Sequence, residues 1–311
     1  MRPRPLPPHL GDSFSVADAR DAGVSAGRLR AGDLGSPFRG VRSRMPAAPH
    51  ADLFGEQALR RRAEQYAHRM TPHEFFSHVT AAVLWDLPLP RWVVDGRSLD
   101  VAVLLPRRAP ASEQVAGHAL TPGSTAVVRH PVTGFAVTCP ATTWALLGTT
   151  VRGVDDLVVA GDAAIRVPMH RTDQPALATR AQLEAAVAAG RRRGAASLRA
   201  ALPLLHERSR SRPETKLRLL LEDAGLGGAE VNADVVEDGI WLGQVDLAYR
   251  ARRVALEYEG EHHLTDLDQW HRDIARYDRL SAAGWRVIRV TKDQLARPDA
   301  LLATLRRALA P

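Results

Sequence analysis

Residues 244–259, QVDLAYRARRVALEYE, decide the fold that we expect for the end of this chain. Apolar and polar side chains alternate on both sides of an Arg-rich turn, a pattern typical of a two-stranded hairpin. The alternation places Gln244 and Asp246 on one face of the first strand, and Glu257 and Glu259 on one face of the second. The opposite faces carry Val245, Leu247 and Tyr249 in the first strand and Val254, Leu256 and Tyr258 in the second. Carboxylates are poor strand formers and costly to bury unpaired, so their presence here indicates a function.

The segments around this hairpin predict one mixed α/β domain over residues 199–311. Pro213 stands in the first turn of a helix whose leucines recur at helical spacing until Gly225 ends it. The elements that we expect afterwards are strands at 229–236, 242–249 and 253–259, a helix at 266–283, a strand at 285–290 and a last helix to Leu309. Their order, αβββαβα, predicts an α/β fold in which helices cover a sheet.

Asp246 and Glu257 lie on neighbouring strands of this hairpin and on one face of the expected sheet. Their carboxylate oxygens would reach a common point, which suits a hard cation such as Mg²⁺ or Mn²⁺. Such a cation polarises a phosphate, lowers the pKa of an attacking water and offsets charge on the leaving oxygen. The alternative is that Glu257 and Glu259 pair with arginines on a solvated sheet face.

The remainder of the chain divides into three parts before the C-terminal domain. They are a flexible N-terminus at 1–11, a winged-helix-like segment at 12–48 and a small middle α/β domain at 49–198. In the middle domain we expect helices at 77–85, 140–147 and 154–165 and strands at 99–105 and 134–138. Arg191, Arg192 and Arg193 fall in an Ala-rich stretch that we expect to be helical.

The segment at 12–48 predicts two short helices, one at 15–22 and one from an N-cap at Ser25 to Arg30. A wing strand at 38–44 would follow, so that several arginines face one DNA duplex. These arginines are Arg28, Arg30, Arg39, Arg42 and Arg44. Helix pairs with a glycine turn also occur in proteins that touch no DNA, so this alternative stays open.

The histidines of the middle region show no ligand-like spacing and no flanking carboxylate pairs. They are His68, His73, His78, His118, His130 and His170. We therefore interpret them as surface or packing residues and not as metal ligands.

The chain carries 42 Lys and Arg against 35 Asp and Glu, a formal charge of +7 with a pI near 10.4. A basic chain favours a polyanionic partner such as double-stranded DNA, although a merely basic solvated surface would give the same count. Cys139 is the single cysteine, so no intramolecular disulfide is expected and a reducing cytoplasm fits. No apolar run approaches the ~18 residues of a membrane helix, so we expect no membrane association.

Three stretches resemble the very short patch repair endonuclease-like proteins that are grouped as domain of unknown function 559, within the PD-(D/E)XK nuclease superfamily. They are QVDLAY at 244–249, RVALEYEGEHH at 253–263 and RDIARYDRLSAAGWRVIRVT at 272–291. The acidic strand, the paired histidines, the Arg/Asp helix and the Gly-Trp-Arg-Val strand follow the family's order. The resemblance implies a restriction-endonuclease-like fold and divalent-metal-dependent cleavage of DNA.

The N-terminal part is similar to the AbiEi-type antitoxins, which carry a winged-helix segment. FSVADARDAGVSAGRLR at 14–30 and SHVTAAVLWDLPLP at 77–90 carry this weaker likeness. It implies a DNA-directed module at the start of the chain and leaves open a toxin or defence-system partner.

The resemblance to the nuclease superfamily implies that Asp246 and Glu257 bind the metal and that Glu214, on the first helix, supplies a further acidic ligand. The motif lysine belongs two residues after Glu257, where this chain has Glu259. A glutamate can add ligand oxygens or act as a base, whereas a lysine would stabilise negative charge. Relatives commonly carry an acidic residue there, so the substitution leaves the mechanism open.

Two further groups follow the acidic strand in the family's order. His262 and His263 resemble the family's histidines, and one of them could act as general acid or base or join the metal shell. Asp273 and Arg276 lie one helical turn apart and could support the site or hold a phosphate.

We therefore expect a divalent-metal-dependent DNA endonuclease that an N-terminal segment directs to DNA. The first alternative is a non-cleaving DNA-binding regulator or antitoxin-like protein that keeps the nuclease fold. The second is a protein-interaction scaffold whose basic surface is incidental. The sequence leaves homodimer formation open.

Overall fold

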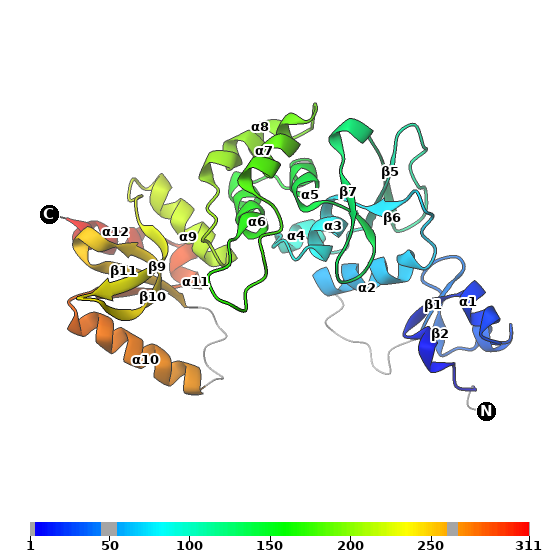
Figure 1. The fold of residues 1–311 in the computed structure, drawn as a ribbon, viewed down its shortest axis with the longest axis horizontal. Helices are drawn as coiled ribbons and strands as arrows, with labels where there is room; N and C mark the ends of the chain where they lie inside the picture. Colours follow the sequence, from blue (N-terminus) through cyan, green and yellow to red (C-terminus); the bar gives the residue numbers. More distant parts are fainter. Residues whose placement is uncertain (1–3, 45–54, 260–266, 311) are drawn as a thin grey trace. The chain divides into compact units, whose positions relative to one another are not determined.

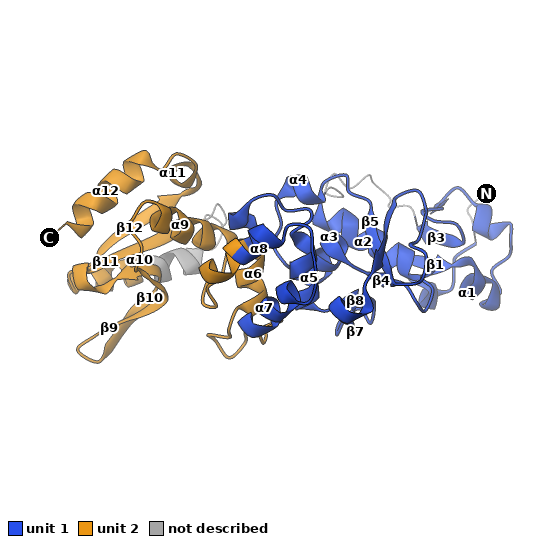
Figure 2. Cartoon of the chain, turned by 90° about the horizontal axis from the view of Figure 1, so that it is seen from above, with its two compact units in different colours: residues 1–157, 180–199 blue, residues 158–179, 200–311 orange. Residues whose placement is uncertain are grey.

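The structure, a computed structural model, describes residues 4–44, 55–259 and 267–310 (Figure 1). The chain forms two compact units, one of residues 1–157 with 180–199 and one of residues 158–179 with 200–311 (Figure 2). Both units combine helices with mixed sheets, so the fold belongs to the α/β class. None of the helices in the described parts is long and apolar enough to span a bilayer.

The N-terminal segment is a small three-stranded sheet with one short helix. Its elements are β1 (Ser13–Ser15), α1 (Val16–Asp21), the 3₁₀ turn η2 (Arg28–Arg30), β2 (Leu34–Gly35) and β3 (Val41–Arg44), with strand order β1-β3-β2. Helix α1 begins where expected, because the Ser15 hydroxyl accepts a hydrogen bond from the Asp18 N–H at 2.9 Å. The expected second helix is wrong. Ser25 does accept from the Arg28 N–H at 3.3 Å, but the chain then makes a single 3₁₀ turn, too short for a recognition helix.

The middle of the chain builds a five-stranded sheet in the order β6-β5-β4-β8-β7. Its strands are β4 (Phe75–Phe76), β5 (Leu99–Leu104), β6 (Val115–Leu120), β7 (Val127–Arg129) and β8 (Ala136–Thr138). The helices are α2 (Glu56–Ala67), α3 (His78–Leu84), α4 (Arg91–Val94), α5 (Pro140–Leu147), α6 (Val154–Ile165), α7 (Arg180–Ala188) and α8 (Ala195–Ala201). The expected helices at 77–85, 140–147 and 154–165 and strands at 99–105 and 134–138 are confirmed, but the sequence pattern missed α2, β4, α4, β6 and β7.

The arginines at 191–193 lie in a turn between α7 and α8, so the expected continuous helix is wrong. Gly194 explains the break, because its φ of +75° is left-handed backbone that favours glycine. A Cβ on Gly194 would lie 1.7 Å from the carbonyl oxygen of Gly148, so this close approach also requires a glycine.

The C-terminal domain has the expected order αβββαβα, with one additional short helix. Its elements are α9 (Arg212–Asp223), β9 (Glu230–Glu237), β10 (Ile240–Tyr249), β11 (Val254–Glu259), α10 (Leu267–Ala282), β12 (Arg286–Thr291), α11 (Lys292–Ala296) and α12 (Asp299–Leu309). Helix α9 begins at Ser211, whose hydroxyl accepts from the Glu214 N–H. The sheet order is β12-β11-β10-β9, with β11 and β12 parallel and the other pairs antiparallel.

This sheet lies between two helical layers, each with its own core (Figure 1). One core joins α9 and α12 to Val231, Leu247, Val254, Leu256 and Val290. The other joins α10 to Ala233, Val235, Val245, Ala248 and Ala255. The shared face of Val254, Leu256 and Tyr258 is confirmed.

The expected alternation along β10 breaks at Asp246. Val245 packs on the α10 side of the sheet, whereas Leu247 and Tyr249 pack on the opposite side. The break coincides with Asn232 on the paired strand, which has a left-handed φ of +45°. Simple period-two alternation therefore does not fix the direction of Asp246.

Residues 158–179, which we expected within the middle domain, group with the C-terminal unit. Asp162 of α6 is buried and accepts hydrogen bonds from the His206 N–H at 2.7 Å and the Thr215 hydroxyl at 2.9 Å. It also pairs with Arg218 of α9 at 3.0 Å. Burial raises the pKa of Asp162 to about 6 even though Arg218 opposes this shift.

Candidate functional site

Asp246 lies at the point where the backbone pairing of β10 and β11 gives way to side-chain contacts. The paired residues run from Tyr249 and Val254 to Leu247 and Leu256. One residue further, Asp246 Oδ2 accepts a hydrogen bond from the Tyr258 N–H at 2.7 Å. The paired register covers residues 247–249 of β10; its continuation would bring Asp246 level with Glu257, but the alternation of faces along β10 breaks at Asp246.

The carboxyl group of Asp246 lies in a strongly perturbed environment. Burial raises its pKa to about 7, and the negative charge of Glu214 adds to the shift. The Tyr258 N–H and the charge of Arg276 act in the opposite direction and are outweighed. Two acidic groups thus share a site in which negative charge is poorly compensated.

Glu214 comes from the first turn of α9 and is held by two donors. Its Oε2 accepts from the Arg210 N–H at 3.0 Å and from Asn232 Nδ2 at 2.7 Å. Asn232, which has a left-handed backbone, thus lies where β9 meets the N-terminal end of α9. Its side-chain amide holds Glu214 near Asp246. The proximity of Glu214 to Asp246 is consistent with the prediction that the first helix supplies an acidic residue to the site.

Glu257 is buried, with 6% of its surface exposed, and it pairs with an arginine from α10. Arg276 Nη1 donates to Glu257 Oε1 at 2.7 Å and to the Gln244 carbonyl at 2.5 Å. Nη2 lies 3.4 Å from Glu257 Oε2, and the guanidinium stacks on Tyr277 with its carbon 5.0 Å from the ring centre. Arg276 therefore compensates the charge of Glu257 and ties α10 to both β10 and β11.

Gly243 leaves room for the Arg276 side chain to pack against strand β10. A Cβ at this position would lie 2.8 Å from both Cγ and Cδ of Arg276, closer than real Cβ contacts come. The glycine thus permits the arginine stem to lie directly against the backbone of β10.

Glu259, at the place of the motif lysine, is partly exposed and paired. Its Oε1 lies 3.0 Å from Nη1 of Arg289 on the neighbouring strand β12. Both strand glutamates therefore form ion pairs with arginines, as the alternative interpretation had it, but Glu257 is buried and does not lie on a solvated face.

The acidic residues fit a hard cation by their chemistry. Asp246, Glu257 and Glu214 offer oxygen donors alone, and the pKa of Asp246 is raised first by burial and then by the negative charge of Glu214, a charge that a divalent cation would offset. Within the described part of the chain, however, these three residues do not bring a ligand atom each within 4.8 Å of the others. Mg²⁺ usually takes one or two carboxylates and completes its shell with water and phosphate oxygens, so this spread is compatible with binding.

Three of the expected site residues cannot be placed. His262 and His263 lie outside the described residues, and so does the side chain of Asp273. Their roles remain predictions.

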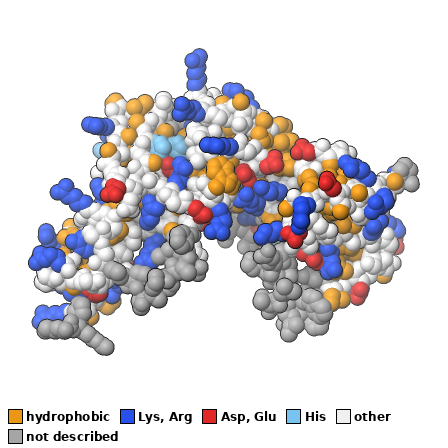
Figure 3. All heavy atoms as spheres, turned by 180° about the vertical axis from the view of Figure 1, so that it is seen from behind, with side chains coloured by type: hydrophobic (Ala, Val, Ile, Leu, Met, Phe, Trp, Pro, Cys, Tyr) orange, Lys and Arg blue, Asp and Glu red, His pale blue; other side chains and the backbone are white. Residues whose placement is uncertain are grey.

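The N-terminal arginines fall into two groups. Arg28 donates to the Arg4 carbonyl at 2.6 Å and to both oxygens of Asp33, and Arg42 donates to Leu29, Val41 and Ser36. Arg30 and Arg39 are exposed. The first pair holds the segment together, so phosphate contacts are expected chiefly from the second pair. On the face drawn in Figure 3, basic side chains are spread with acidic ones among them.

A second polar cluster was missed by the sequence analysis. His78, Asp100 and His118 each offer one ligand atom within 4.8 Å of the others, so the expectation that these histidines are mere surface or packing residues needs revision. They come from three separate elements, and their spacing has no recognisable motif. The available signal was Asp100, a carboxylate in the otherwise apolar strand LDVAVL at 99–104.

Comparisons with known proteins extend to part of the chain. No family model matches it. Two relatives are uncharacterized proteins of Mycobacterium tuberculosis, one from strain CDC 1551 / Oshkosh and one from strain ATCC 25618 / H37Rv. Each is 32% identical over 139 residues, which cover 42% of this chain and 49% of the relative. The chain thus spans about half the length of the curated relatives it matches.

One solved structure is similar to part of the chain, the catalytic domain of the homing endonuclease I-Bth0305I. The match has a TM-score of 0.25 and 19% identity, and it covers 31% of this chain and 91% of that domain.

Proposed function

We propose that the C-terminal domain is a divalent-metal-dependent DNA endonuclease that hydrolyses phosphodiester bonds. The observation that carries the proposal is Asp246, a buried carboxyl group with a pKa of about 7 that lies near Glu214 and near Arg276, the arginine that pairs with Glu257. Carboxyl groups with strongly perturbed pKa values cluster at functional sites, because catalysis and metal binding require groups whose charged form is disfavoured or tuned by the surroundings.

Asp246 and Glu257 would hold Mg²⁺ or Mn²⁺, with Glu214 as a further acidic ligand or as support for Asp246. A cation bound there would polarise the scissile phosphate and lower the pKa of the attacking water. Arg276 already spans β10 and β11, and its guanidinium has the geometry to bind a phosphate oxygen in place of Glu257. Glu259, paired with Arg289, would act as a base or ligand only after leaving that partner.

The net charge of +7 supports DNA as the substrate, since Arg and Lys neutralise phosphates and release counterions. We also propose that residues 12–48 direct the chain to duplex DNA, chiefly through Arg30 and Arg39. We further propose a cytoplasmic location and leave open both a homodimer and a toxin or defence-system partner.

The second candidate is a DNA-binding regulator that keeps the nuclease fold without cleavage. The ion pairs of Glu257 with Arg276 and of Glu259 with Arg289 favour it, because both glutamates are compensated without a metal. The two candidates differ in one measurable property, which is the cleavage of DNA in the presence of a divalent cation.

Incubation of the purified chain with supercoiled plasmid and Mg²⁺ or Mn²⁺ tests the proposal. We expect nicked or linear product with the natural protein and with Asp234→Asn, an exposed carboxylate on the neighbouring strand β9. Asp246→Asn and Glu257→Gln should lower the cleavage rate at least about 100-fold, since each removes a proposed metal ligand. DNA binding without cleavage by the natural protein would support the regulator instead.

Cleavage by the Glu259→Lys variant distinguishes an active nuclease site from an inactive one. A lysine introduced there loses the ion pair with Arg289 and places a cation beside the proposed metal, so we expect cleavage to fall. A natural protein that is inert and a Glu259→Lys variant that cuts plasmid would show that the motif lysine is required and that the proposed mechanism is wrong.

A further inference from the structure

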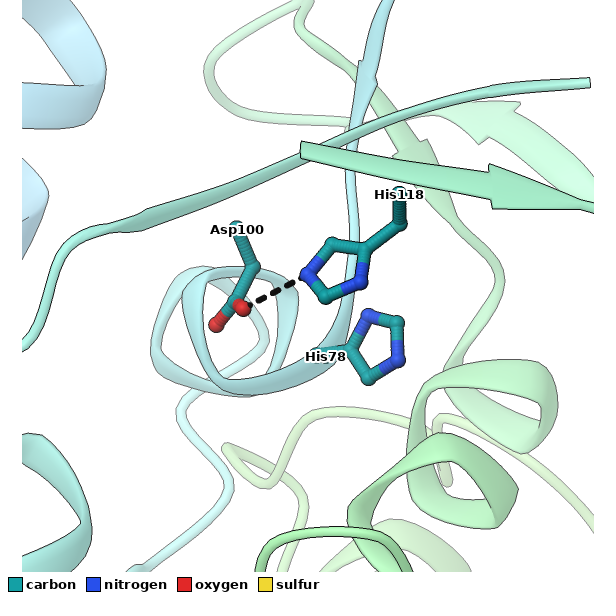
Figure 4. Close-up of side chains that lie close together, drawn as sticks. All are labelled: His78, Asp100 and His118. Atoms are coloured by element: carbon teal, nitrogen blue, oxygen red, sulfur yellow. Dashed lines mark hydrogen bonds and ion pairs between the residues drawn. The ribbon is translucent and has the colours of Figure 1, made fainter. Parts of the chain in front are cut away.

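The middle sheet holds a cluster of His78, Asp100 and His118 that the proposed nuclease site does not use (Figure 4). His78 is the first residue of α3, while Asp100 and His118 come from the neighbouring parallel strands β5 and β6. Asp100 is fully buried and His78 is 5% exposed. Such a polar group inside an apolar sheet costs free energy unless each member has partners or a ligand.

The two oxygens of Asp100 have different surroundings. Oδ2 accepts from the Val79 N–H at 3.2 Å and from Arg97 Nε at 3.0 Å, which fixes the plane of the carboxylate. Oδ1 lies 2.9 Å from His118 Nε2 and also 3.2 Å from Arg97 Nη2. Arg97 thus contacts both oxygens and holds the carboxylate in one plane, with Oδ1 turned toward His118.

The two imidazole rings are stacked, with their centres 4.0 Å apart and their planes at 26°. Figure 4 shows both rings on the same side of the Asp100 carboxylate.

The backbone at His78 adds a second observation. Its φ is +46°, a left-handed conformation that few residues other than glycine adopt, with asparagine, aspartate and histidine the most frequent among them. Nδ1 of the same ring lies 3.0 Å from the Ser77 hydroxyl, which holds the ring direction. A strained backbone of this kind persists only where the surrounding contacts hold it in place, and such residues cluster at functional sites.

His118 is the member of the cluster that faces solvent. Its side chain is 27% exposed, whereas Asp100 behind it is closed to solvent.

We propose that His78, Asp100 and His118 bind one first-row transition-metal ion of the Zn²⁺ class. Two imidazole nitrogens and one carboxylate oxygen form a donor set that suits Zn²⁺ or Co²⁺ better than Mg²⁺. The ion takes the place of the proton between His118 Nε2 and Asp100 Oδ1, and the ring stays neutral because its one N–H proton is then on Nδ1. The present separation of 2.9 Å is shorter than the roughly 3.4 Å between two tetrahedral ligands that each lie about 2.1 Å from one ion, so the two groups move slightly apart when the ion binds. Water completes the coordination.

Co²⁺ titration of the full, chelator-treated chain tests this site, because Co²⁺ bound by nitrogen and oxygen ligands absorbs visible light. We expect one equivalent to bind with a visible band that Zn²⁺ removes and that millimolar Mg²⁺ does not. His118→Asn and His78→Asn should each weaken binding at least 10-fold. Asparagine keeps a polar side chain at both positions and tolerates the positive φ at 78.

Two control variants separate this site from others. His73→Asn removes an exposed histidine of the same region, and Asp246→Asn removes the proposed nuclease ligand, so both should bind Co²⁺ like the natural protein. Equal Co²⁺ affinity in all variants, or no visible band in the natural protein, would overturn the proposal.

If a variant fails to fold, an NMR spectrum of the Co²⁺-loaded natural protein tests the site instead. Paramagnetically shifted N–H signals from two histidines support the site, and their absence contradicts it. Loss of cleavage in Asp246→Asn with unchanged Co²⁺ binding keeps the two proposals distinct.

Discussion

Arg276 Nη1 lies 2.7 Å from Glu257 Oε1, so the buried glutamate of β11 is neutralised by an arginine from α10. The side chains are 20% and 8% exposed, which makes this pair less accessible to water than an ordinary surface salt bridge. Removal of one partner from such a pair leaves an uncompensated charge in a partly apolar environment.

Arg276→Ala should lower the free energy of unfolding by about 2 kcal/mol, because Glu257 and the Gln244 carbonyl both lose their donor. Urea denaturation measures this loss, with Arg286→Ala on β12 as the exposed control. The double variant Arg276→Ala with Glu257→Gln should recover part of the stability, since the stranded charge is gone. Equal stability of Arg276→Ala and Arg286→Ala would show that the pair contributes nothing.

Gly243→Ala should destabilise the domain by about 1–3 kcal/mol, because its φ of +153° strains a residue with a side chain and because the new Cβ would lie 2.8 Å from Arg276 Cγ and Cδ. Gly227→Ala is the control, since its nearest neighbour, Glu222 Cγ, would lie at an ordinary 3.5 Å. In an Arg276→Ala background the cost at Gly243 should shrink. A cost that does not change there would mean that the arginine is not the obstacle.

The C-terminal elements could be predicted because each apolar run is bounded by a turn signal. Pro213 and Gly225 bound α9, and the Arg-rich turn at 250–252 separates β10 from β11. The division of the last helix into α11 and α12 was missed, although Pro298 stands at the break. Local sequence carries this kind of information well, since it depends on backbone preferences within a few residues.

The candidate sites were less predictable, because they depend on contacts between distant residues. Asp246 and Glu257 were found from strand alternation, yet the alternation itself breaks at Asp246 beside the left-handed Asn232. The pairing of Glu257 with Arg276 crosses from β11 to α10, and no local pattern specifies it. The cluster around Asp100 joins three elements in the same way.

Asp246 should make stability depend on pH. Its pKa is about 7 in the folded chain and near 3.8 when unperturbed, so folding favours the protonated form. The stability that this group contributes is full below about pH 4 and is lost as pH rises to and through 7. Relative to Asp246→Asn, the natural protein should lose more than about 1.4 kcal/mol between pH 5 and 8, the equivalent of one pKa unit. Asp234→Asn should follow the natural protein. A difference between the natural protein and Asp246→Asn that does not change with pH would contradict the raised pKa.

The same group should couple metal binding to pH. A divalent cation binds the charged carboxylate, so Mg²⁺ or Mn²⁺ should raise the Tm of the natural protein more at pH 8 than at pH 6. Asp246→Asn should show a smaller shift at both values. An equal rise in Tm for both proteins would place the cation elsewhere.

Arg30 and Arg39 should contribute to DNA binding, whereas Arg28 should contribute to stability. The double variant Arg30→Ala with Arg39→Ala should bind a DNA duplex more weakly and reduce the salt dependence of the affinity by about 2 in the log–log slope, because two phosphate contacts are lost. Its Tm should stay unchanged, since both side chains are exposed. Arg28→Ala should instead lower the Tm, because it loses Asp33 and the Arg4 carbonyl. Arg297→Ala with Arg306→Ala removes the same charge from exposed positions of the C-terminal domain and controls for net charge. Equal affinities and slopes for the two double variants at matched salt would refute a specific role of residues 12–48.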